Sequence, residues 1–352
     1  MPNVNIRGVA IEDTFAEAFG MRAARVIITA RDPRWATEAA REMTGFATSV
    51  IACKVEAGIE RELSPSETPD GRPGVSVLLF TMDSDSLVKR MIERIGQTVL
   101  TCVTTACFDG LPDASDRMPI GRSLRVFGDG FQASKVIGGQ RYWRIPVMEG
   151  EFLVQETFGR VKGVGGGNFL ILAESDAAAL DAAEAAVEAM RETPGVALPF
   201  PGGIVRSGSK VGSRRYPSMI ATTNDAFSPT IRSRSPSSLP NGVNAALEIV
   251  LDGVDAPSIA AAMRAGIDAA CRSGIHSISA GNYGGKLGPY HFHLREIMGA
   301  GAAAWATPSR SRCAARSGAA SRRSPSCPMR SRRSTRPASR GCRCGMDPAS
   351  SR

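Results

Sequence analysis

The sequence predicts an α+β fold in which two related ferredoxin-like (split β-α-β) lobes are followed by a C-terminal tail without core-forming residues. Two observations lead to this prediction. Strand and helix patterns alternate along the chain, and the alternation occurs twice in each half of residues 1–298. The composition then changes abruptly, because Leu, Ile, Val, Phe and Lys are absent from residue 299 onward.

In the N-terminal half, two β-α-β units are expected. The apolar run Ala24–Thr29 predicts a buried strand, and Asp32 and Pro33 then supply the N-cap and first-turn proline of a helix that ends at Gly45. The run Thr48–Cys53 is predicted to be the strand that closes this unit. The second unit is predicted to consist of strand Val75–Phe80, a helix with Leu87, Met91 and Ile95 that ends at Gly96, and strand Thr98–Val103.

The C-terminal half repeats this pattern. Strand Asn168–Ala173 is predicted to lead into a helix with an apolar stripe, and strand Ala246–Leu251 into a helix capped by Asp255. The second helix stops at Gly274, and Ile275–Ser279 forms the last strand. The stripe of the first helix consists of Leu180, Ala183, Val187 and Met190.

Three segments follow from this organisation. We predict an N-terminal lobe at residues 1–148, a C-terminal lobe at 149–298 and a tail at 299–352 that is disordered or derived from a frameshift. Two connections, Lys54–Gly74 and Pro199–Gly242, are longer than ordinary connectors, and such loops are usually functional or disordered.

The net charge of +9 comes from the tail. Residues 299–352 contain 12 Arg and one Asp, whereas residues 1–298 contain 31 basic and 33 acidic side chains. A basic arm for nucleic acid is the functional alternative for the tail, but the body lacks the basic surplus that nucleic-acid binding requires. No apolar run approaches the roughly 18 residues of a membrane span, and Glu12 and Asp13 interrupt any signal peptide, so a cytoplasmic protein without membrane contact is expected.

The common catalytic and metal-binding motifs are absent. The sequence has no Walker loop, no His-Glu-x-x-His and no Gly-x-Ser-x-Gly elbow. The glycines at 163 and 165–167 precede a strand, whereas a dinucleotide motif follows one, so they predict a bulge or close backbone packing. His291 and His293 share a strand face without a third ligand nearby, which favours a structural role, and no metal site is predicted.

Glu248 is the most informative residue for chemistry. It is the only ionisable side chain of the strand ALEIVL (246–251). A carboxyl group there must find a cationic partner or have a raised pKa and remain protonated near neutral pH. A neutral carboxylic acid can donate a hydrogen bond to a carbonyl oxygen that becomes an oxyanion. The alternative is a position at a sheet edge with the carboxyl group in water.

Two loops contain candidate binding residues. Residues 199–213 combine glycines and serines, including Ser209, with the cations Arg206 and Lys210, and such a loop suits a carboxylated or phosphorylated small molecule. The alternative is a solvated surface loop. In the second loop, ATTNDAFSPT (221–230), a cleft is predicted to be lined by Asn224, Asp225 and Ser228, with a plain turn as the alternative.

The sequence as a whole resembles formylmethanofuran–tetrahydromethanopterin formyltransferases, in the form found in methylotrophic bacteria as well as methanogens. The likeness extends over residues 1–298 and does not include the tail. Residues 232–240 (RSRSPSSLP) depart from it, because an acidic spacer is expected there. The stretches that carry the resemblance include VAIEDTFAEAF (9–19), TGFATSVIAC (44–53), ETPDGRPGV (67–75), GGGNFLILAES (165–175), PFPGGIV (199–205), TNDAFSPT (223–230), LEIVLDG (247–253) and ISAGNYGGKLG (278–288).

The resemblance implies an enzyme that moves a formyl group between N5 of a tetrahydromethanopterin-type pterin and the amine of a methanofuran-type carrier, in one-carbon metabolism. It implies no bound metal or prosthetic group, since both carriers are substrates. It also implies a homotetramer assembled from dimers, and association with other subunits of a formyltransferase/hydrolase complex. Glu248 would be the catalytic acid, and the loop with Arg206 and Lys210 would bind the anionic parts of the substrates. The alternative is a non-catalytic scaffold or binding subunit of such a complex.

Overall fold

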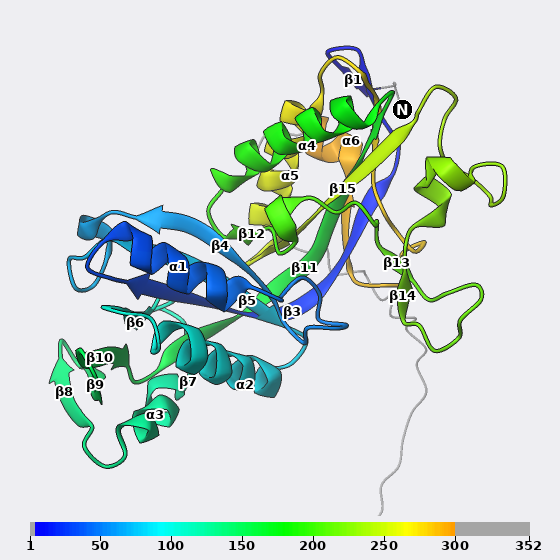
Figure 1. The fold of residues 1–352 in the computed structure, drawn as a ribbon. Helices are drawn as coiled ribbons and strands as arrows, with labels where there is room; N and C mark the ends of the chain where they lie inside the picture. Colours follow the sequence, from blue (N-terminus) through cyan, green and yellow to red (C-terminus); the bar gives the residue numbers. More distant parts are fainter. Residues whose placement is uncertain (1–3, 300–352) are drawn as a thin grey trace, which may run out of the picture. The chain divides into compact units, whose positions relative to one another are not determined.

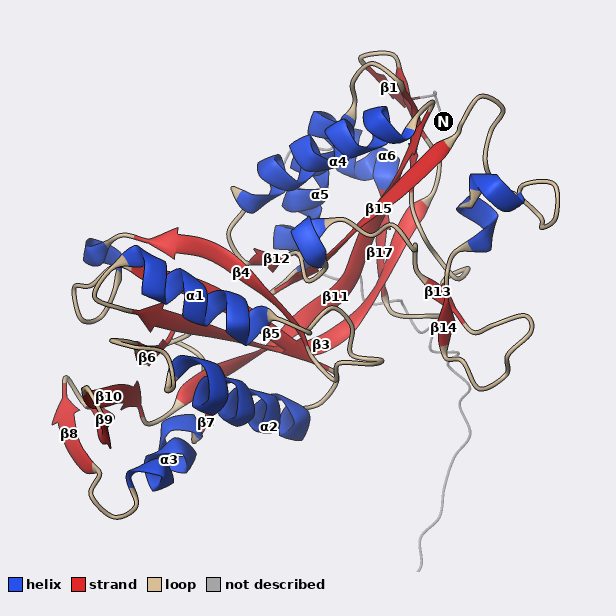
Figure 2. Cartoon of the chain, in the orientation of Figure 1, coloured by secondary structure: helices blue, strands red, loops and turns tan. Residues whose placement is uncertain are grey.

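Fifteen strands of the computed structural model belong to one continuous sheet, and helices pack on it in both halves of the chain (Figures 1 and 2). The structure describes residues 4–299. The predicted disorder or frameshift origin of the tail therefore concerns residues that lie outside the described part of the chain, apart from residue 299.

The N-terminal lobe is built on a split β-α-β fold. Its elements are β3 (Phe15–Thr29), α1 (Pro33–Thr44), β4 (Glu56–Leu63), β5 (Gly74–Thr81), α2 (Ser84–Arg94) and β6 (Ala106–Asp109). The strand order is β4-β5-β3-β6 with antiparallel neighbours. Because the helices connect β3 to β4 and β5 to β6, this is the ferredoxin-like arrangement that the sequence predicts.

The C-terminal lobe repeats the same topology. Its elements are β11 (Phe158–Ala173), α4 (Asp176–Arg191), β12 (Val196–Ala197), β15 (Ala245–Gly253), α5 (Ala256–Ala270) and β16 (Ile275–Ser279). The strand order is β12-β15-β11-β16, again antiparallel. The predicted pair of related lobes is confirmed.

The first strand of each lobe is long enough to serve both lobes. Residues 161–165 of β11 pair antiparallel with residues 19–23 of β3, so the two sheets are continuous. The C-terminal strand β17 (Tyr290–His293) pairs with the start of β3, and the N-terminal hairpin of β1 (Val4–Ile6) and β2 (Val9–Ile11) adds to β16. Segments from both ends of the chain therefore complete the C-terminal lobe, and the boundary after residue 148 stays a prediction.

Side-chain caps define where the four main helices begin. The Asp32, Asp83, Ser175 and Asp255 side chains each accept a hydrogen bond from a backbone N–H three residues later. Each helix then buries one face against the sheet, where α4 contributes mostly Ala and α5 contributes Ile259, Met263 and Ile267. Small residues on α4 allow these two neighbouring helices to approach closely (Figure 1).

Two predicted strands are wrong. Residues 50–53 form turns, and Thr48 makes only an isolated bridge with Glu56. Phe46 and Lys54, which flank this segment, have left-handed backbone φ angles of 48° and 64°, and the strand that follows is β4. Much of the predicted loop 54–74 is therefore a strand. The sequence pattern did not predict β4 because the strand contains glutamates and an arginine. Glu56 and Glu60 are nevertheless buried, through specific partners that the sequence does not reveal.

The second wrong strand is Thr98–Val103. Gly96 does not end α2, because the chain continues in a π-helical turn over Ile95–Val99 and buries Ile95 and Val99. The strand that pairs with β3 is β6, a few residues later. In an apolar run this short, hydrophobic periodicity does not distinguish a strand from a buried helical turn.

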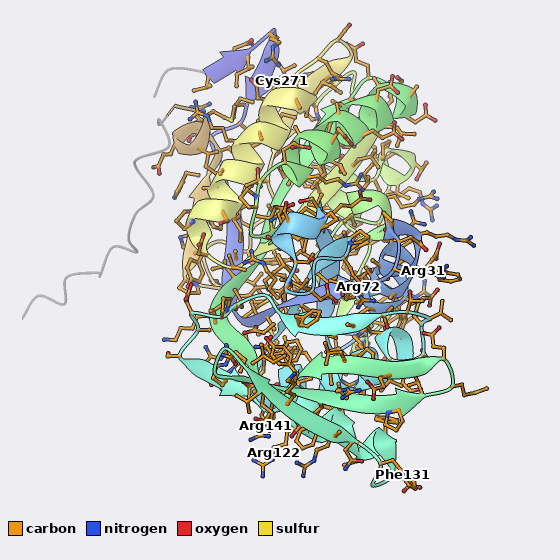
Figure 3. The ribbon with its side chains drawn as sticks, turned by 90° about the vertical axis from the view of Figure 1, so that its left-hand side faces the viewer. Arg31, Arg72, Arg122, Phe131, Arg141 and Cys271 are labelled. Atoms are coloured by element: carbon orange, nitrogen blue, oxygen red, sulfur yellow. The ribbon has the colours of Figure 1, made fainter. Side chains whose placement is uncertain are left out.

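The remaining elements extend the lobes. In the N-terminal lobe, the polypeptide turns at Phe131, which lies at the outer end of the lobe with 82% of its surface exposed (Figure 3). The segment 199–242 contains short elements only. The elements are β7 (Asp116–Met118), α3 (Ile120–Leu124), β8 (Ala133–Ile137), β9 (Gln140–Val147), β10 (Gly150–Gln155), β13 (Lys210–Val211), β14 (Ala221–Thr222), α6 (Leu294–Gly299) and 3₁₀ turns at Pro65–Glu67, Arg125–Gly128, Pro201–Gly203, Asp225–Phe227 and Pro229–Ile231.

Candidate active site

A cavity of about 470 Å³ is lined by residues of both lobes. The N-terminal lobe supplies residues 48–51, and the C-terminal lobe supplies β15 and the loop after β16. Its walls are largely apolar, with carboxyl groups at three positions. The lining residues are Glu17, Phe19, Thr48, Ser49, Val50, Ile51, Glu56, Met82, Gly166, Asn168, Phe200, Ser209, Val211, Glu248, Val250, Gly281, Tyr283 and Leu287.

Glu248 points into this cavity from β15 and is only 3% exposed. Its backbone is paired on both sides, with Leu170 of β11 and with Val205, and this pairing fixes the position of its Cα atom. Burial raises the pKa of the Glu248 carboxyl to about 7, and hydrogen bonds from Ser209 offset part of that rise. Its Oε2 atom is buried and has no hydrogen-bond partner among residues 4–299. The carboxyl group can therefore be protonated near neutral pH and retain a free donor site.

Glu17 organises the loop opposite Glu248. This carboxylate is 1% exposed and accepts backbone N–H groups from Tyr283 (2.8 Å), Gly285 (3.1 Å), Gly288 (3.0 Å) and Leu287. Burial acts to raise the pKa of Glu17, but these four hydrogen bonds outweigh it and hold the pKa below its usual value. The charged carboxylate thus fixes the loop 283–288.

Tyr283 transmits this order to the residues around Glu248. Its hydroxyl accepts a hydrogen bond from the Val211 N–H (3.1 Å) and donates one to the Ser209 carbonyl (3.4 Å). Ser209 in turn acts on Glu248, whose pKa it lowers through hydrogen bonding. A continuous chain of contacts therefore runs from Glu17 to Glu248.

The loop that contains Arg206 and Lys210 forms ion pairs with the neighbouring segment around Asp225. Lys210 Nζ lies 2.5 Å from Asp225 Oδ1, and Arg214 lies 3.2 Å from Asp225 Oδ2. Ser235 also donates to Asp225, at 2.8 Å, so the unusual segment 232–240 takes part in this cluster. The hydrogen bond from Lys210 is the main reason that the pKa of Asp225 falls to about 2.

The candidate residues from the sequence fall into two groups. Glu248 and Ser209 line the cavity, whereas Arg206, Lys210, Asn224, Asp225 and Ser228 do not. Asn224 and Ser228 stabilise the loop, through the Asn224 N–H to Ser207 and the Ser228 hydroxyl to the Asn224 carbonyl. Arg206 is exposed and makes no hydrogen bond or ion pair with another described residue.

Sequence reasoning missed Glu17, Glu56 and Asp252. Each is a carboxyl group in a strand and is buried, and Asp252 lies one residue beyond the window in which Glu248 stood out. Applying the Glu248 criterion to VAIEDTFAEAF (9–19) would have found Glu17, an acid between apolar neighbours.

The glycines at 163 and 165–167 lie inside β11 at a register shift, so the predicted bulge is confirmed. The His291 and His293 rings lie 4.9 and 5.2 Å from the Phe15 ring. Within residues 4–299, no group of three or more His, Cys, Asp or Glu side chains is arranged to hold a metal ion. No helix in the same range is long and apolar enough to cross a bilayer.

Family models match nearly all of the described chain. One, described as formylmethanofuran–tetrahydromethanopterin formyltransferase, matches residues 4–147, and another, described as the FTR proximal lobe, matches residues 150–297. The resemblance seen in the sequence is therefore confirmed in both halves.

Relatives of high identity match this chain over nearly their whole length. The formylmethanofuran–tetrahydromethanopterin formyltransferase of Methylobacillus flagellatus is 62% identical over 300 residues, which cover 83% of this chain and 99% of the relative. A subunit of the formyltransferase/hydrolase complex of Methylorubrum extorquens is 49% identical over 308 residues, which cover 85% of this chain and 98% of that subunit.

Solved structures agree with the fold. The Methanosarcina barkeri formyltransferase has a TM-score of 0.81 at 52% identity and covers 84% of this chain and 100% of its own. The M. extorquens formyltransferase/hydrolase complex, solved with methylofuran, has a TM-score of 0.82 at 48% identity and covers 84% and 99%. On these matches, the chain belongs to the formylmethanofuran–tetrahydromethanopterin formyltransferase family.

Proposed function

We propose that this chain transfers a formyl group between N5 of a tetrahydromethanopterin-type pterin and the amine of a methanofuran-type carrier, in cytoplasmic one-carbon metabolism. The observation that carries the proposal is Glu248, a buried carboxyl group with a raised pKa and a free oxygen in a cavity. The names of the relatives supply the substrates.

Glu248 acts as a neutral acid in this reaction. The attacking amine adds to the formyl carbon, and the carbonyl oxygen becomes an oxyanion that accepts a hydrogen bond from the protonated Glu248. The attacking nitrogen loses its proton, the leaving nitrogen gains one, and the original C–N bond breaks. A preorganised donor favours the transition state over the ground state, because the oxygen gains charge only as the bond forms.

Formyl transfer can be tested with the purified chain and the two carriers alone. We expect the formylated furan carrier to accumulate from the formylated pterin, and the reverse reaction to run when the formylated furan is supplied. Mass spectrometry of both carriers measures the transfer. A chain that binds both carriers and transfers nothing in either direction would be the scaffold subunit, and the proposed function would be wrong.

Arg206 is proposed to bind a remote anionic part of a substrate, because it is exposed and unpaired among the described residues beside the cavity loop. We expect Arg206→Glu to raise KM about tenfold with less change in kcat, since a remote contact acts equally on ground and transition states. Lys210 is a poorer test, because its substitution would also release Asp225. The control is Arg31→Glu on the N-terminal lobe (Figure 3), and equal kinetics for both variants would contradict the role of Arg206.

We also propose that the chain assembles as a homotetramer, a dimer of dimers, and that it joins other subunits of a formyltransferase/hydrolase complex. Exposed apolar side chains around β8 support an assembly, because patches of this kind are usually covered by another chain. They are Val126, Phe127, Phe131, Val136, Ile137 and Met148. The relative from M. extorquens is itself named as part of such a complex.

Residues 300–352 are expected to be dispensable. The family models end at residue 297, and every residue that lines the cavity lies between positions 17 and 287. Deleting 300–352 should leave both the transfer rate and the tetramer mass unchanged, as measured by the carrier assay and by light scattering. A shorter chain that precipitates or is monomeric would give the tail a structural role.

A further inference from the structure

Two carboxyl groups, Glu56 and Asp252, are buried beside the cavity, and Glu56 also lines it. Asp252 is fully buried in β15, four residues after Glu248 and on the same face of that strand. Glu56 begins β4, is 7% exposed and lines the cavity. Glu56 raises the pKa of Asp252 through its charge and through a side-chain hydrogen bond, so the two carboxyl groups act on each other. One comes from each lobe, so the contact joins the lobes.

Each carboxyl group also holds one segment of the wall. Glu56 Oε1 accepts the Val50 N–H at 3.0 Å, and Asp252 Oδ1 accepts the Gly166 N–H at 3.1 Å. Val50 and Gly166 both line the cavity, and Gly166 is the bulge of β11 with a φ of 89°. The pair therefore fixes two wall segments that belong to different lobes.

A hydrogen bond between two carboxyl groups requires a proton on one of them. Burial, reinforced by the charge of Glu56, raises the pKa of Asp252 well above its usual value. Asp252 Oδ2 is buried and has no hydrogen-bond partner among residues 4–299, so this oxygen is free to carry a proton.

No cation replaces that proton. Neither carboxyl group forms an ion pair within residues 4–299, and none of the described residues that line the cavity is Lys, Arg or His. The adjoining residues 196–197 of β12 and 163–167 of β11 have no titratable side chain. The other titratable groups at the cavity are Glu248, Tyr283 and Glu17, and Glu17 is held by backbone N–H groups.

We propose that protonated Asp252 donates a hydrogen bond to Glu56, and that this pair is a positioning element that sets the spacing of the two cavity walls for substrate. Neither residue acts on the reacting atoms. Loss of the shared proton would bring two like charges into contact in a buried site, so the walls would separate as the pair ionises. Only the kinetic test of this pair rests on the proposed function, because the stability test needs no substrate.

The stability test compares wild type with Asp252→Asn, whose amide retains a donor toward Glu56 and an acceptor for Gly166. An aspartic acid in an unfolded chain ionises near pH 4, so unfolding of the wild type releases the proton of Asp252 and stability falls as pH rises. The variant lacks this loss. We expect its thermal midpoint to exceed that of the wild type by about 3 °C or more at pH 9, and the gap to shrink toward pH 5. The control, Asp181→Asn on exposed α4, should show no gap at either pH. A gap that is reversed, or that is independent of pH, would overturn the proposal.

The kinetic test separates positioning from a purely structural role. Asp252→Ala should raise KM about tenfold with less effect on kcat, and Asp252→Asn should restore KM to within about threefold of the wild type. An unchanged KM in Asp252→Ala, or no rescue by Asp252→Asn, would overturn the positioning role. If Asp252→Ala does not fold, Glu56→Gln serves instead. It should reduce the pH dependence of the midpoint, and an unaltered dependence would refute the shared proton.

Discussion

Replacing Glu248 by Ala should lower kcat by about 10²–10³-fold, which is the usual loss when one oxyanion donor is removed. Glu248→Gln should lose less, because the amide keeps a donor and the approximate shape of the acid. Both variants should keep the fold, since the backbone of Glu248 is held by β11 and by Val205. The carrier assay at saturating substrate measures the difference.

The pH dependence gives an independent test of the same role. The pKa of Glu248 is about 7, and only the protonated acid can donate, so kcat should fall as pH rises through about 7. The Gln variant should lack this loss, because its amide does not titrate. An ionised base at this position would give the opposite profile, with activity lost on acidification and Gln as damaging as Ala.

Glu174→Ala is a matched control for a lost carboxyl group. Glu174 is exposed in the same lobe and uses only its backbone in the hydrogen bonds to the segments around it. It should retain wild-type kcat and the wild-type pH profile. If Glu248→Ala also retains them, formyl transfer must rely on a different donor.

The repeated β-α-β pattern was readable from the sequence because hydrophobic period and helix caps agree in the segments concerned. The predicted N-caps at Asp32 and Asp255 act within a few residues of the chain. In the predicted stripe on α4, Ala183, Val187 and Met190 are buried, whereas Leu180 is 46% exposed and that part of the prediction is wrong. Glu248 could also be identified from local sequence, because an acid inside an otherwise apolar strand differs from all of its neighbours.

The rest of the site depends on contacts between distant parts of the chain. Glu56 belongs to a strand that mixes acids with small and basic residues, so its sequence resembles a polar loop. Its partner Asp252 lies about 200 positions away in the chain. Glu17 is similar, because its four donors lie more than 260 residues away. Local pattern cannot assign a partner that lies so far along the chain, so these carboxyl groups require the structure.

Glu17→Ala is expected to have the largest effect on stability. The substitution removes a buried carboxylate and leaves four N–H groups of the loop 283–288 without their acceptor. Unsatisfied buried donors cost about 1–3 kcal/mol each, and partial rehydration of the loop reduces the sum, so we expect a loss of about 3 kcal/mol in the free energy of unfolding. Denaturant titration of the variant measures this loss.

The pKa of Glu17 is shifted in the opposite direction to that of Glu248. Its folded pKa lies below the usual value, so its contribution to stability is complete above the unfolded pKa and is lost as pH falls through the folded pKa. Stability of the wild type should therefore decrease toward acid more than stability of Glu17→Gln, which has no charge to neutralise. Glu62→Ala, at an exposed position of β4, is the control and should unfold like the wild type.

Glu17 should also affect catalysis through Tyr283. Release of the loop would free the Tyr283 hydroxyl from Val211 and Ser209, and Glu248 would then lose the hydrogen bonds from Ser209 that lower its pKa. Because burial alone would then act on Glu248, the alkaline fall in kcat should move to higher pH in Glu17→Gln, provided the cavity stays closed to water. Tyr283→Phe breaks the same chain of contacts one step later and should move the profile in the same direction with a smaller loss of stability. An unshifted profile in both variants would mean that Ser209 is held independently of Glu17.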